Sequence, residues 1–248
     1  MNQSFYIGAI GAQQQQKSLN VTSNNIANVN SYGFKGELSR FTNLVYHDVR
    51  TAGGADAKSG SGTCVWGTDT NFRAGTPAHT GRKQDYMIEG SGFFALVDPA
   101  TNEVSFTRNG AFSMASLEQP TGELDENGNL KTDLVYYLSD GNGRFVLGAD
   151  GDMIRMTDPN EKQDVGIFDY ANYNGMEHLD GTRFRAIDKN GDLTFGSGKL
   201  VQGMLETSNV DLAEEMTKVI EAQRAYSMAL KMVSTSDEIE STINNLRG

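Results

Sequence analysis

The C-terminal segment constrains this chain most, because from Ser208 onward it contains no proline, and no glycine before Gly248. Proline and glycine are the strongest helix breakers, so one uninterrupted helix is expected here. Ser208 and Asp211 predict a capping box at its start. Glu214 and Glu215 would then complement the positive end of the helix dipole. At about 1.5 Å per residue the helix would be roughly 55 Å long, more than a compact domain requires.

Apolar side chains recur along this segment at the spacing of one helix face. They are Met216, Val219, Ile220, Tyr226, Leu230, Val233, Ile239, Ile243 and Leu246. A stripe of this kind predicts burial against a partner. The function of the chain therefore depends on what this helix packs on.

Residues 3 to about 30 predict a second, weaker helix at the other end of the chain. Its apolar positions are Phe5, Ala9, Ala12, Leu19 and Ile26. Polar residues interrupt this stripe, so the helix depends on packing for its stability. A run of asparagines ends it, because asparagine competes for backbone hydrogen bonds. These residues are Asn24, Asn25, Asn28 and Asn30.

The middle of the chain is rich in turns and predicts β structure. Residues 32–82 show no sustained periodicity, and Thr51–Thr63 reads as a linker or mobile loop between short strands at Leu44–Val49 and Thr63–Trp66. Further candidate strands are Tyr86–Ile88, Phe93–Val97, Val104–Thr107, Leu134–Leu138, Arg144–Leu147, Met153–Met156, Val165–Phe168 and Phe184–Ile187. Short strands without intervening helices indicate an antiparallel arrangement.

Six turn dipeptides separate these strands, each offering the positive φ angle that tight hairpins need. They are Asn109-Gly110, Asn127-Gly128, Asp140-Gly141, Asn142-Gly143, Asp150-Gly151 and Asn190-Gly191. The stretch from Asp188 to Asp192 has oxygen ligands at alternate positions, but its glycine is fourth and Lys199 stands twelfth. In an EF-hand the glycine is sixth and a glutamate twelfth, so a hairpin turn is favoured over a calcium site.

Composition argues against several classes of function. The net charge of −11 disfavours binding to nucleic acid or to anionic membranes. The single Cys64 excludes an internal disulfide framework, and no known nucleophile, zinc or phosphate-binding motif accompanies it. No apolar run is long enough to span a bilayer, and no basic segment marks a signal peptide before Phe5–Ala12. Taken alone, the missing signal peptide predicts a cytoplasmic protein. We expect no enzymatic activity, no cofactor and no metal.

Four motifs, in order along the chain, resemble those of the bacterial flagellar rod and hook proteins. The first is LNVTSNNIANVNSYGFK (Leu19–Lys35), and the last is LVQGMLETSNVDLAEEMTKVIEAQRAYSMALKMVSTSDEI (Leu200–Ile239). Between them stand DYMIEGSGFFALVD (Asp85–Asp98) and FTRNGAFSM (Phe106–Met114). The stretch Gly62–Gly81 is also similar to the family pattern.

Some features depart from the family pattern. Extra residues lie at about 130–146, the part beyond Asp150 matches loosely, and the chain is too short for the outer domain of a full-length hook protein. Length therefore favours a rod protein. The Q-R-A-Y helix resembles the distal rod type and the opening MNQSFYIGAIGA the proximal type, so the type stays open.

The resemblance implies an α+β protein in which paired long terminal helices form a coiled-coil-like axial core. They enclose an antiparallel β-rich middle domain joined by extended linkers. The expected divisions are an N-terminal helix (1–30), a linker with a flexible loop (31–83), the β-rich domain (84–198), and a return segment with the C-terminal helix (199–248).

The implied function is a structural subunit of the flagellar basal-body rod. It would self-assemble into a helical tube that transmits torque from motor to hook and forms an export channel. The implied partners are copies of itself, adjacent rod and hook proteins, and the flagellar export apparatus, with no membrane insertion. The resemblance also replaces the cytoplasmic expectation with export to the cell wall or periplasmic space. The alternatives are a hook-type flagellar protein and a calcium-binding, β-rich surface adhesin.

Assembly residues are expected in both terminal motifs. Polar side chains in a subunit interface can fix register at some cost in stability, and Asn24, Asn25, Asn28, Gln223 and Arg224 are candidates for this role. The full expected set is Asn24, Asn25, Asn28, Phe34, Gln202, Gly203, Asn209, Met216, Val219, Ile220, Gln223, Arg224, Tyr226, Leu230 and Val233.

Overall fold

The computed structural model describes residues 3–50, 56–124, 130–156 and 162–247. The chain forms two compact units, each built from separate stretches of sequence. The helical unit comprises Met1–Asn28, Gly36–Asn71 and Val210–Gly248, and the β unit comprises Val29–Lys35 and Phe72–Asn209. An N-terminal helix, a β-rich middle and a C-terminal helix confirm the predicted α+β class.

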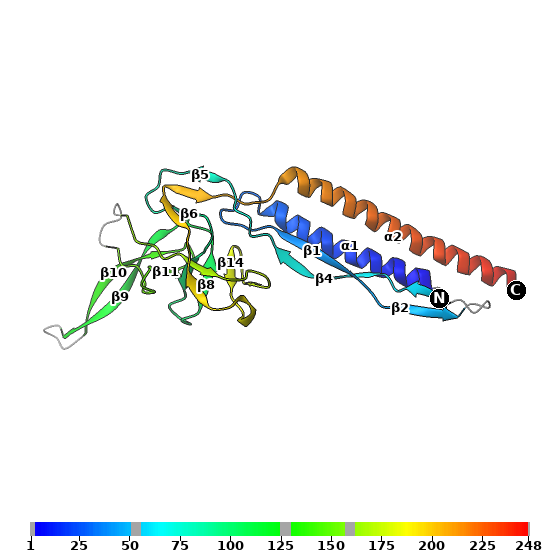
Figure 1. The fold of residues 1–248 in the computed structure, drawn as a ribbon, viewed down its shortest axis with the longest axis horizontal. Coiled ribbons are helices and arrows are strands. Elements are labelled where there is room, and N and C mark those ends of the chain that lie inside the picture. Colours follow the sequence, from blue (N-terminus) through cyan, green and yellow to red (C-terminus); the bar gives the residue numbers. More distant parts are fainter. Residues whose placement is uncertain (1–2, 51–55, 125–129, 157–161, 248) are drawn as a thin grey trace. The chain divides into compact units, whose positions relative to one another are not determined.

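Two long helices, α1 (Gln3–Ala27) and α2 (Leu212–Arg247), lie side by side in the helical unit (Figure 1). They run antiparallel, because Gly8 lies against Val233 whereas Asn25 is hydrogen-bonded to Glu215. With 36 residues against 25, α2 is the longer helix, and its C-terminal turns extend past Gln3.

The start of α2 differs from the prediction. Asp211 is the N-cap residue, since its Oδ1 accepts hydrogen bonds from the backbone N–H groups of Ala213 (2.9 Å) and Glu214 (3.4 Å). The helix therefore begins at Leu212. The expected capping box led by Ser208 is wrong, because the carboxylate of Asp211 caps the first turn directly.

Small and polar residues form the interface between the two helices. A Cβ atom on Gly8 would lie only 3.0 Å from Val233 Cγ2 and 3.2 Å from the carbonyl oxygen of Ala229. Backbones this close leave little room for large side chains between them. The buried residues of the two helices are Gly8, Ala12, Gln14, Thr22, Asn25, Glu215, Ala222 and Ser236.

Much of the apolar stripe on α2 lies outside this contact with α1. Val219, Tyr226 and Val233 are half-buried. The other six positions are exposed because the close-packed face of α2 is occupied by smaller residues. These six are Met216, Ile220, Leu230, Ile239, Ile243 and Leu246.

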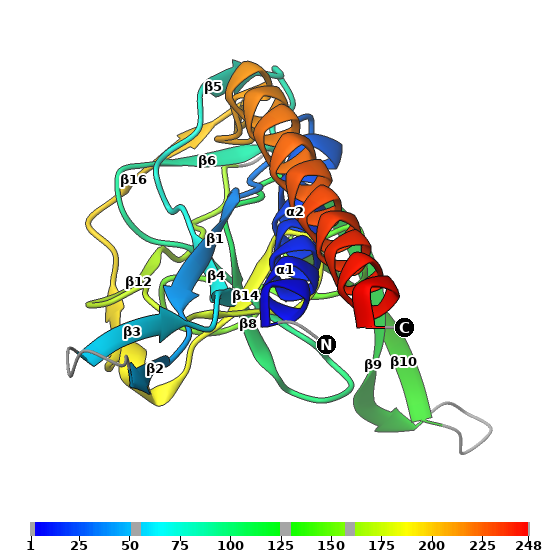
Figure 2. The same cartoon turned by 90° about the vertical axis from the view of Figure 1, so that its right-hand side faces the viewer.

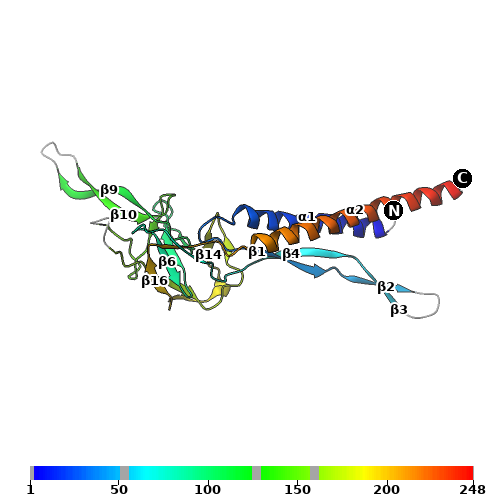
Figure 3. The same ribbon diagram turned by 90° about the horizontal axis from the view of Figure 1, so that it is seen from above.

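A long antiparallel β ribbon completes the helical unit (Figure 3). Strand β1 (Glu37–Asn43) pairs with β4 (Thr63–Thr70), and β2 (Tyr46–Arg50) pairs with β3 (Asp56–Gly60). In the end-on view the ribbon and α2 both adjoin α1, on different sides of it (Figure 2). The prediction of a linker or mobile loop at Thr51–Thr63 is therefore wrong for β3, while residues 51–55 lie outside the described part of the chain.

The β unit is built around a seven-stranded sheet with the order β13-β14-β8-β7-β11-β10-β9. All of its strand pairs are antiparallel, as predicted. Its strands are β7 (Phe94–Val97), β8 (Val104–Thr107), β9 (Ser113–Leu124), β10 (Leu130–Ser139), β11 (Phe145–Val146), β13 (Glu177–His178) and β14 (Arg183–Arg185).

Three shorter antiparallel pairs complete the β unit. Strand β5 (Pro77–His79) pairs with β17 (Met204–Glu206), and β6 (Tyr86–Glu89) pairs with β16 (Lys199–Gln202). Strand β12 (Phe168–Tyr170) pairs with β15 (Leu193–Phe195). The return segment of the chain is thus held to the start of the β unit by two ladders.

Aromatic residues dominate the core of the β unit. One cluster is centred on Tyr86, Phe94 and Phe112, and a second on Phe93 and Phe184. These side chains are at most 1% exposed. All four residues of β7 are buried, and successive side chains enter the two clusters in turn, so this part of the sheet is covered on both faces.

Most expected strands are present, but not all. Met153–Met156 makes only isolated bridges, from Arg155 to Tyr137 of β10 and from Met153 to Leu147, which follows β11. Of the six expected turns, Gly143, Gly151 and Gly191 have a φ of +83° and confirm the prediction. Gly110 and Gly141 do not have a positive φ, so those two predictions are wrong, and 127–128 lie outside the described residues.

Gly110 is required for a different reason, since a Cβ atom there would lie 1.7 Å from the carbonyl oxygen of Tyr86. The backbone of Tyr86 also donates a hydrogen bond to the carbonyl of Gly110 at 3.0 Å. Any side chain would therefore break this close approach of β6 to the segment between β8 and β9.

Candidate assembly surfaces

The outward face of α2 carries the largest set of exposed apolar side chains described on either helix. Met216 is 53% exposed, Ile220 51% and Met228 66%. Ile220 and Met228 line a shallow hollow together with Gln223, Arg224 and Ser227. Large apolar side chains exposed in this number are typical of a surface that another protein covers.

A second, more apolar hollow lies between the two helices. Tyr226, Leu230 and Val233 of α2 line one side of it, and Ala9 and Ala12 of α1 line the other. The small alanine side chains leave this space open above the close contact at Gly8. Of the residues that the sequence predicted for assembly, seven therefore lie at or beside an accessible surface of α2. They are Met216, Val219, Ile220, Gln223, Arg224, Tyr226 and Leu230, and Val233 also lines the apolar hollow.

Asn25 is engaged within the chain. Its side chain is 2% exposed and donates hydrogen bonds to the carbonyl of Glu37 (2.8 Å) and to Glu215 Oε2 (3.1 Å). Its Oδ1 accepts a hydrogen bond from the backbone N–H of Glu37 at 2.9 Å. One side chain therefore ties α1 to both α2 and β1.

Asn24 and Asn28 close the C-terminal end of α1. The Asn28 amide donates to the carbonyl oxygen of Asn24 (3.0 Å) and to its side-chain Oδ1 (3.1 Å). Both bonds are exposed to solvent, so they supply local capping at the end of the helix.

Four other expected assembly residues lie in the β unit and have partners there. Phe34 is 3% exposed, and its carbonyl accepts a hydrogen bond from the backbone N–H of Asn209. The side chain of Asn209 donates to the carbonyl of Arg73 at 3.0 Å. Gln202 donates to the carbonyl of Lys83 at 2.6 Å. Gly203 adopts a φ of +78° in the turn between β16 and β17.

A buried charge network, which the sequence reasoning missed, joins three distant motifs in the β unit. Glu206 accepts hydrogen bonds from Lys35 Nζ (2.5 Å), from Arg108 Nη1 (3.2 Å) and from the backbone N–H of Gly75 (2.8 Å). The Lys35 ammonium also donates to the carbonyl of Arg73 at 2.8 Å. The three charged side chains are at most 6% exposed.

The electrostatics of this network follow from burial. Desolvation lowers the pKa of Lys35 from its ordinary value, and the carboxylate of Glu206 opposes that shift. Two cations share one anion, and Arg108 also donates to the carbonyls of Ile88 and Gly90. The network therefore ties together the segments through which the chain enters and leaves the β unit. Glu206 lies in the motif LETSN, Lys35 in GFK and Arg108 in FTRNG. Their placement in these family motifs is the only sequence feature that could have indicated the network.

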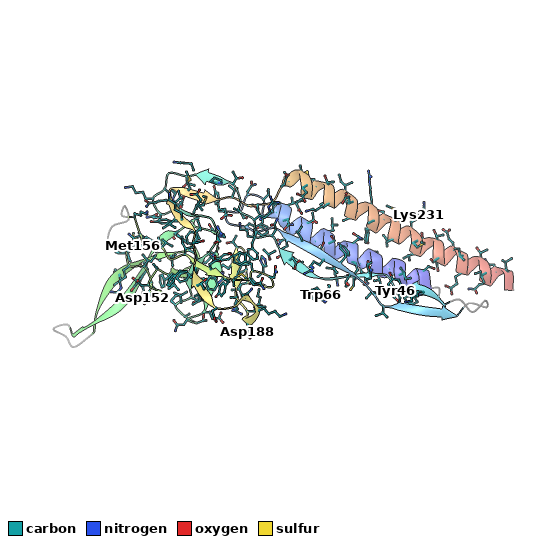
Figure 4. The ribbon with its side chains drawn as sticks, viewed as in Figure 1. Tyr46, Trp66, Asp152, Met156, Asp188 and Lys231 are labelled. Carbon is teal, nitrogen blue, oxygen red and sulfur yellow. The ribbon has the colours of Figure 1, made fainter. Side chains whose placement is uncertain are left out.

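The ribbon carries a set of exposed apolar residues that the sequence also did not predict for assembly. Trp66 is 74% exposed, Val45 75% and Tyr46 56%. Figure 4 labels Trp66 and Tyr46 on the ribbon and Lys231 on α2. The guanidinium of Arg40 lies 5.8 Å from the centroid of the Trp66 ring, a cation–π contact at an exposed site.

Across residues 3–50, 56–124, 130–156 and 162–247, no group of three or more His, Cys, Asp or Glu side chains is placed to hold a metal ion. Asn190, in the acidic turn of the 3₁₀ helix η1 (Asp188–Asn190), is fully buried, and its Oδ1 accepts from the backbone N–H of Ile187 at 2.6 Å. Within the described part of the chain, no helix is both long and apolar enough to cross a membrane.

Comparison with known proteins gives a consistent result. The family described as "Flagella basal body rod protein" matches residues 5–35, and "Flagellar basal body rod FlgEFG protein C-terminal" matches residues 201–246. The flagellar basal-body rod protein FlgG of Bacillus subtilis is 31% identical, with all of both chains covered.

Two proteins of Caulobacter vibrioides are also similar. Its rod protein FlgG is 30% identical over 99% of both chains, and its rod protein FlgF is 29% identical over 96% of this chain and 95% of its own. The two matched ends correspond to α1 and α2, which carry the accessible surfaces described above. The chain therefore belongs to the flagellar basal-body rod protein family.

Proposed function

We propose that this rod protein assembles with copies of itself into a helical tube, with α1 and α2 forming a coiled-coil-like axial core. The segments that connect the helices to the β unit act as extended linkers in that assembly. The tube transmits torque from the motor to the hook and surrounds an export channel. The protein has a structural role in the flagellar basal body and no catalytic one.

The exposed apolar face of α2 carries this proposal. With about 1.5 Å of rise per residue, the 36 residues of α2 extend for about 54 Å. Its exposed apolar residues include Met216, Ile220, Met228, Leu230, Met232, Ile239, Ile243 and Leu246. Removing such surface from water is the main favourable term in protein association. Contacts between unlike faces that do not close into a ring produce a helical polymer, which is the form a rod needs.

Polar residues on the same face suit a role in register. Gln223 and Arg224 are exposed and flank Ile220, so they can select one alignment of neighbouring helices. Asn25 contributes to assembly indirectly, by holding α1 against α2 and β1. Phe34, Gln202, Gly203 and Asn209 contribute in the same indirect way, by fixing the segments that connect the helices to the β unit.

The partners follow from this position in the basal body. They are other copies of the chain, adjacent rod and hook proteins, and the flagellar export apparatus that delivers the subunit to the cell wall or periplasmic space. The names of the relatives support a rod protein over the hook-type alternative, since both FlgG and FlgF are named rod proteins.

A pair of substitutions on α2 tests the proposal. Ile220→Asp places a charge in the exposed apolar face, and Lys231→Gln removes a charge from an exposed position on the same helix. We expect Ile220→Asp to abolish swimming and to leave truncated rods in electron micrographs of isolated basal bodies. Lys231→Gln should swim normally.

Circular dichroism of the purified variants provides the folding control. Both variants should retain the helical content of the parent, because residue 220 faces solvent in the single chain. Complete rods and normal swimming in the Ile220→Asp strain would refute the assembly role of this face. A deletion strain that builds rods but lacks hooks would instead assign the protein to the hook.

A further inference from the structure

We propose that Asn174 is a site of spontaneous modification, at which the side-chain amide is lost as ammonia and a new carboxylate is left in the β unit. Asparagine followed by glycine favours this reaction, because glycine has no side chain to hinder attack by its own backbone nitrogen. The chain contains five such pairs, and the pair at 127–128 lies outside the described residues. The four described pairs are Asn109-Gly110, Asn142-Gly143, Asn174-Gly175 and Asn190-Gly191.

The reaction consumes one water molecule and releases one ammonia molecule. The backbone nitrogen of Gly175 loses its proton to solvent and attacks Cγ of Asn174, and a C–N bond forms. The bond from Cγ to the side-chain nitrogen then breaks, and that nitrogen takes up a proton and leaves as ammonia. Water opens the resulting cyclic succinimide. Opening at Cγ gives aspartate, whereas opening at the backbone carbonyl gives isoaspartate, in which the main chain runs through Cβ and Cγ.

Asn174 and Gly175 meet both requirements of this attack, an accessible side-chain amide and a free backbone nitrogen. They are the exposed central residues of a turn, which the backbone N–H of Met176 closes by donating to the carbonyl of Tyr173 at 3.3 Å. Gly175 has the φ of +83° that such a turn favours at its second central position. Within the described part of the chain, neither the side-chain amide of Asn174 nor the N–H of Gly175 makes a hydrogen bond.

Two of the other pairs are protected by burial. Asn190 is fully buried, its Oδ1 accepts from the backbone N–H of Ile187 at 2.6 Å, and its Nδ2 donates to the carbonyl of Asn172 at 2.8 Å. Asn109 is half-buried, and its Oδ1 accepts from the backbone N–H of Ala111 at 3.1 Å. Both side chains must give up these hydrogen bonds before the ring can close.

Asn142 is as exposed as Asn174 but differs at the attacking nitrogen. The N–H of Gly143 donates to the carbonyl of Asp140 at 3.1 Å. Oδ1 of Asp140 also accepts from the backbone N–H groups of Asn142 (3.0 Å) and Arg144 (2.9 Å). The nitrogen of Gly143 must therefore leave a well-bonded loop to reach the side chain of Asn142. Exposure and a free nitrogen occur together at Asn174 alone among the four described pairs.

The modification changes the loop that Asn190 holds. The backbone carbonyl of Asn174 accepts a hydrogen bond from Asn190 Nδ2 at 3.4 Å, and in isoaspartate this carbonyl becomes a carboxylate that branches from the main chain. Either product adds one negative charge to a chain whose net charge is −11. The loss of ammonia is irreversible and needs no enzyme. In a subunit that stays in the proposed rod, the modified fraction therefore increases with the age of that subunit.

Peptide mapping by mass spectrometry measures the reaction at each pair. The purified full-length chain is incubated in mildly alkaline buffer, either folded or in concentrated urea, and digested at successive times. In the folded chain we expect Asn174 to lose its amide several-fold faster than Asn109, Asn142 and Asn190, and in urea we expect the four rates to converge. Asn142 or Asn190 reacting as fast as Asn174 in the folded chain would overturn the inference. A rate at Asn174 that falls many-fold on folding would overturn it as well.

Asp140→Ala tests whether local hydrogen bonds protect the second exposed pair. The substitution removes the carboxylate that accepts from the backbone of Asn142 and Arg144, and it leaves the turn at Asn174 unchanged. We expect the rate at Asn142 to rise towards that at Asn174, while the buried Asn190 stays slow in the same digest. An unchanged rate at Asn142, or an equal acceleration at Asn190, would contradict the role assigned to these hydrogen bonds.

Discussion

Glu206 provides the sharpest test of how the β unit is held together. The substitution Glu206→Gln keeps the size of the side chain and removes its negative charge. In the structure this carboxylate is 2% exposed and accepts three hydrogen bonds, two of them from Lys35 and Arg108. The amide of glutamine can accept at its oxygen, but its NH₂ group then faces a cationic donor.

The expected cost follows from the charge balance. Removing one partner of a buried ion pair costs about 3–5 kcal/mol, because an uncompensated charge remains buried. Here two cations would lose their only shared anion in the network, so we expect about 4 kcal/mol. For a domain of this size each kcal/mol lowers the Tm by roughly 2–4 °C, which predicts a decrease of about 8–16 °C.

Lys35→Met is the informative comparison. It leaves Arg108 and Glu206 as a balanced pair, and it removes the hydrogen bond from Lys35 to the carbonyl of Arg73. The carbonyl of Arg73 keeps its hydrogen bond from Asn209, and losing a hydrogen bond to a charged group costs about 1.5–3 kcal/mol, so Lys35→Met should be clearly milder than Glu206→Gln. Glu89→Gln, the same substitution at an exposed position of β6, should be close to neutral.

Urea denaturation followed by near-ultraviolet circular dichroism measures these differences, since the signal comes largely from aromatic residues clustered in the β unit. The free energies of unfolding are compared for the parent and the three variants. A cost of Glu206→Gln below about 1 kcal/mol would refute the charge argument, because that is the range of exposed pairs. A cost for Lys35→Met equal to or above that of Glu206→Gln would refute it as well.

Three further predictions concern single residues. Asn25→Ala should destabilise the helical unit by about 2–3 kcal/mol in thermal melts, because three hydrogen bonds of a buried side chain are lost. Asn28→Ala, at an exposed cap, should cost less than about 1 kcal/mol. Equal effects of the two substitutions would contradict this prediction. Gly11→Ala should raise the Tm, since helix propensity improves by about 1 kcal/mol and the nearest atom to the new Cβ is 3.9 Å away. Gly8→Ala should lower the Tm, because the new Cβ would lie only 3.0 Å from Val233. The opposite order would show that the helices are not packed this closely. Burial and the hydrogen bond to Asp169 raise the pKa of Tyr173 to about 12 from its ordinary value of 10.0. The native state therefore binds more protons than the unfolded state in this range, and stability present below pH 10 is lost as the pH rises towards 12. Tyr173→Phe should make that decline shallower, and an unchanged pH profile would argue against the shift.

The sequence predicted the two helices well, because apolar residues repeat at helical spacing in both segments and the α2 segment lacks internal glycine and proline. It did not predict which face of α2 would be covered by α1. Large apolar residues normally indicate the buried face. In this chain, close packing at Gly8 selects Ala222, Glu215 and Ser236 for the inside, and the large residues remain outside.

The ribbon and the charge network were harder to predict for different reasons. Strand β1 reads ELSRFTN, in which apolar residues do not alternate, so it carries no strand signal of its own. Glu206 lies 171 residues from Lys35 and 98 from Arg108, so no local pattern links them. Only the fold brings these three charges together, and a single sequence does not reveal such pairings.

The antiparallel contact of α1 with α2 also sets the order in which the chain can mature. Asn25 and its partner Glu215 are 190 residues apart, and the contact of Gly8 with Val233 also joins the two ends of the chain. A chain that emerges from its N-terminus presents α1 first, when nothing exists to cover it, and supplies α2 last. Contacts this distant in sequence form slowly, because the entropy cost of closing a long loop comes before any stabilising contact is made. The helical unit is therefore completed only when the residues of α2 are available.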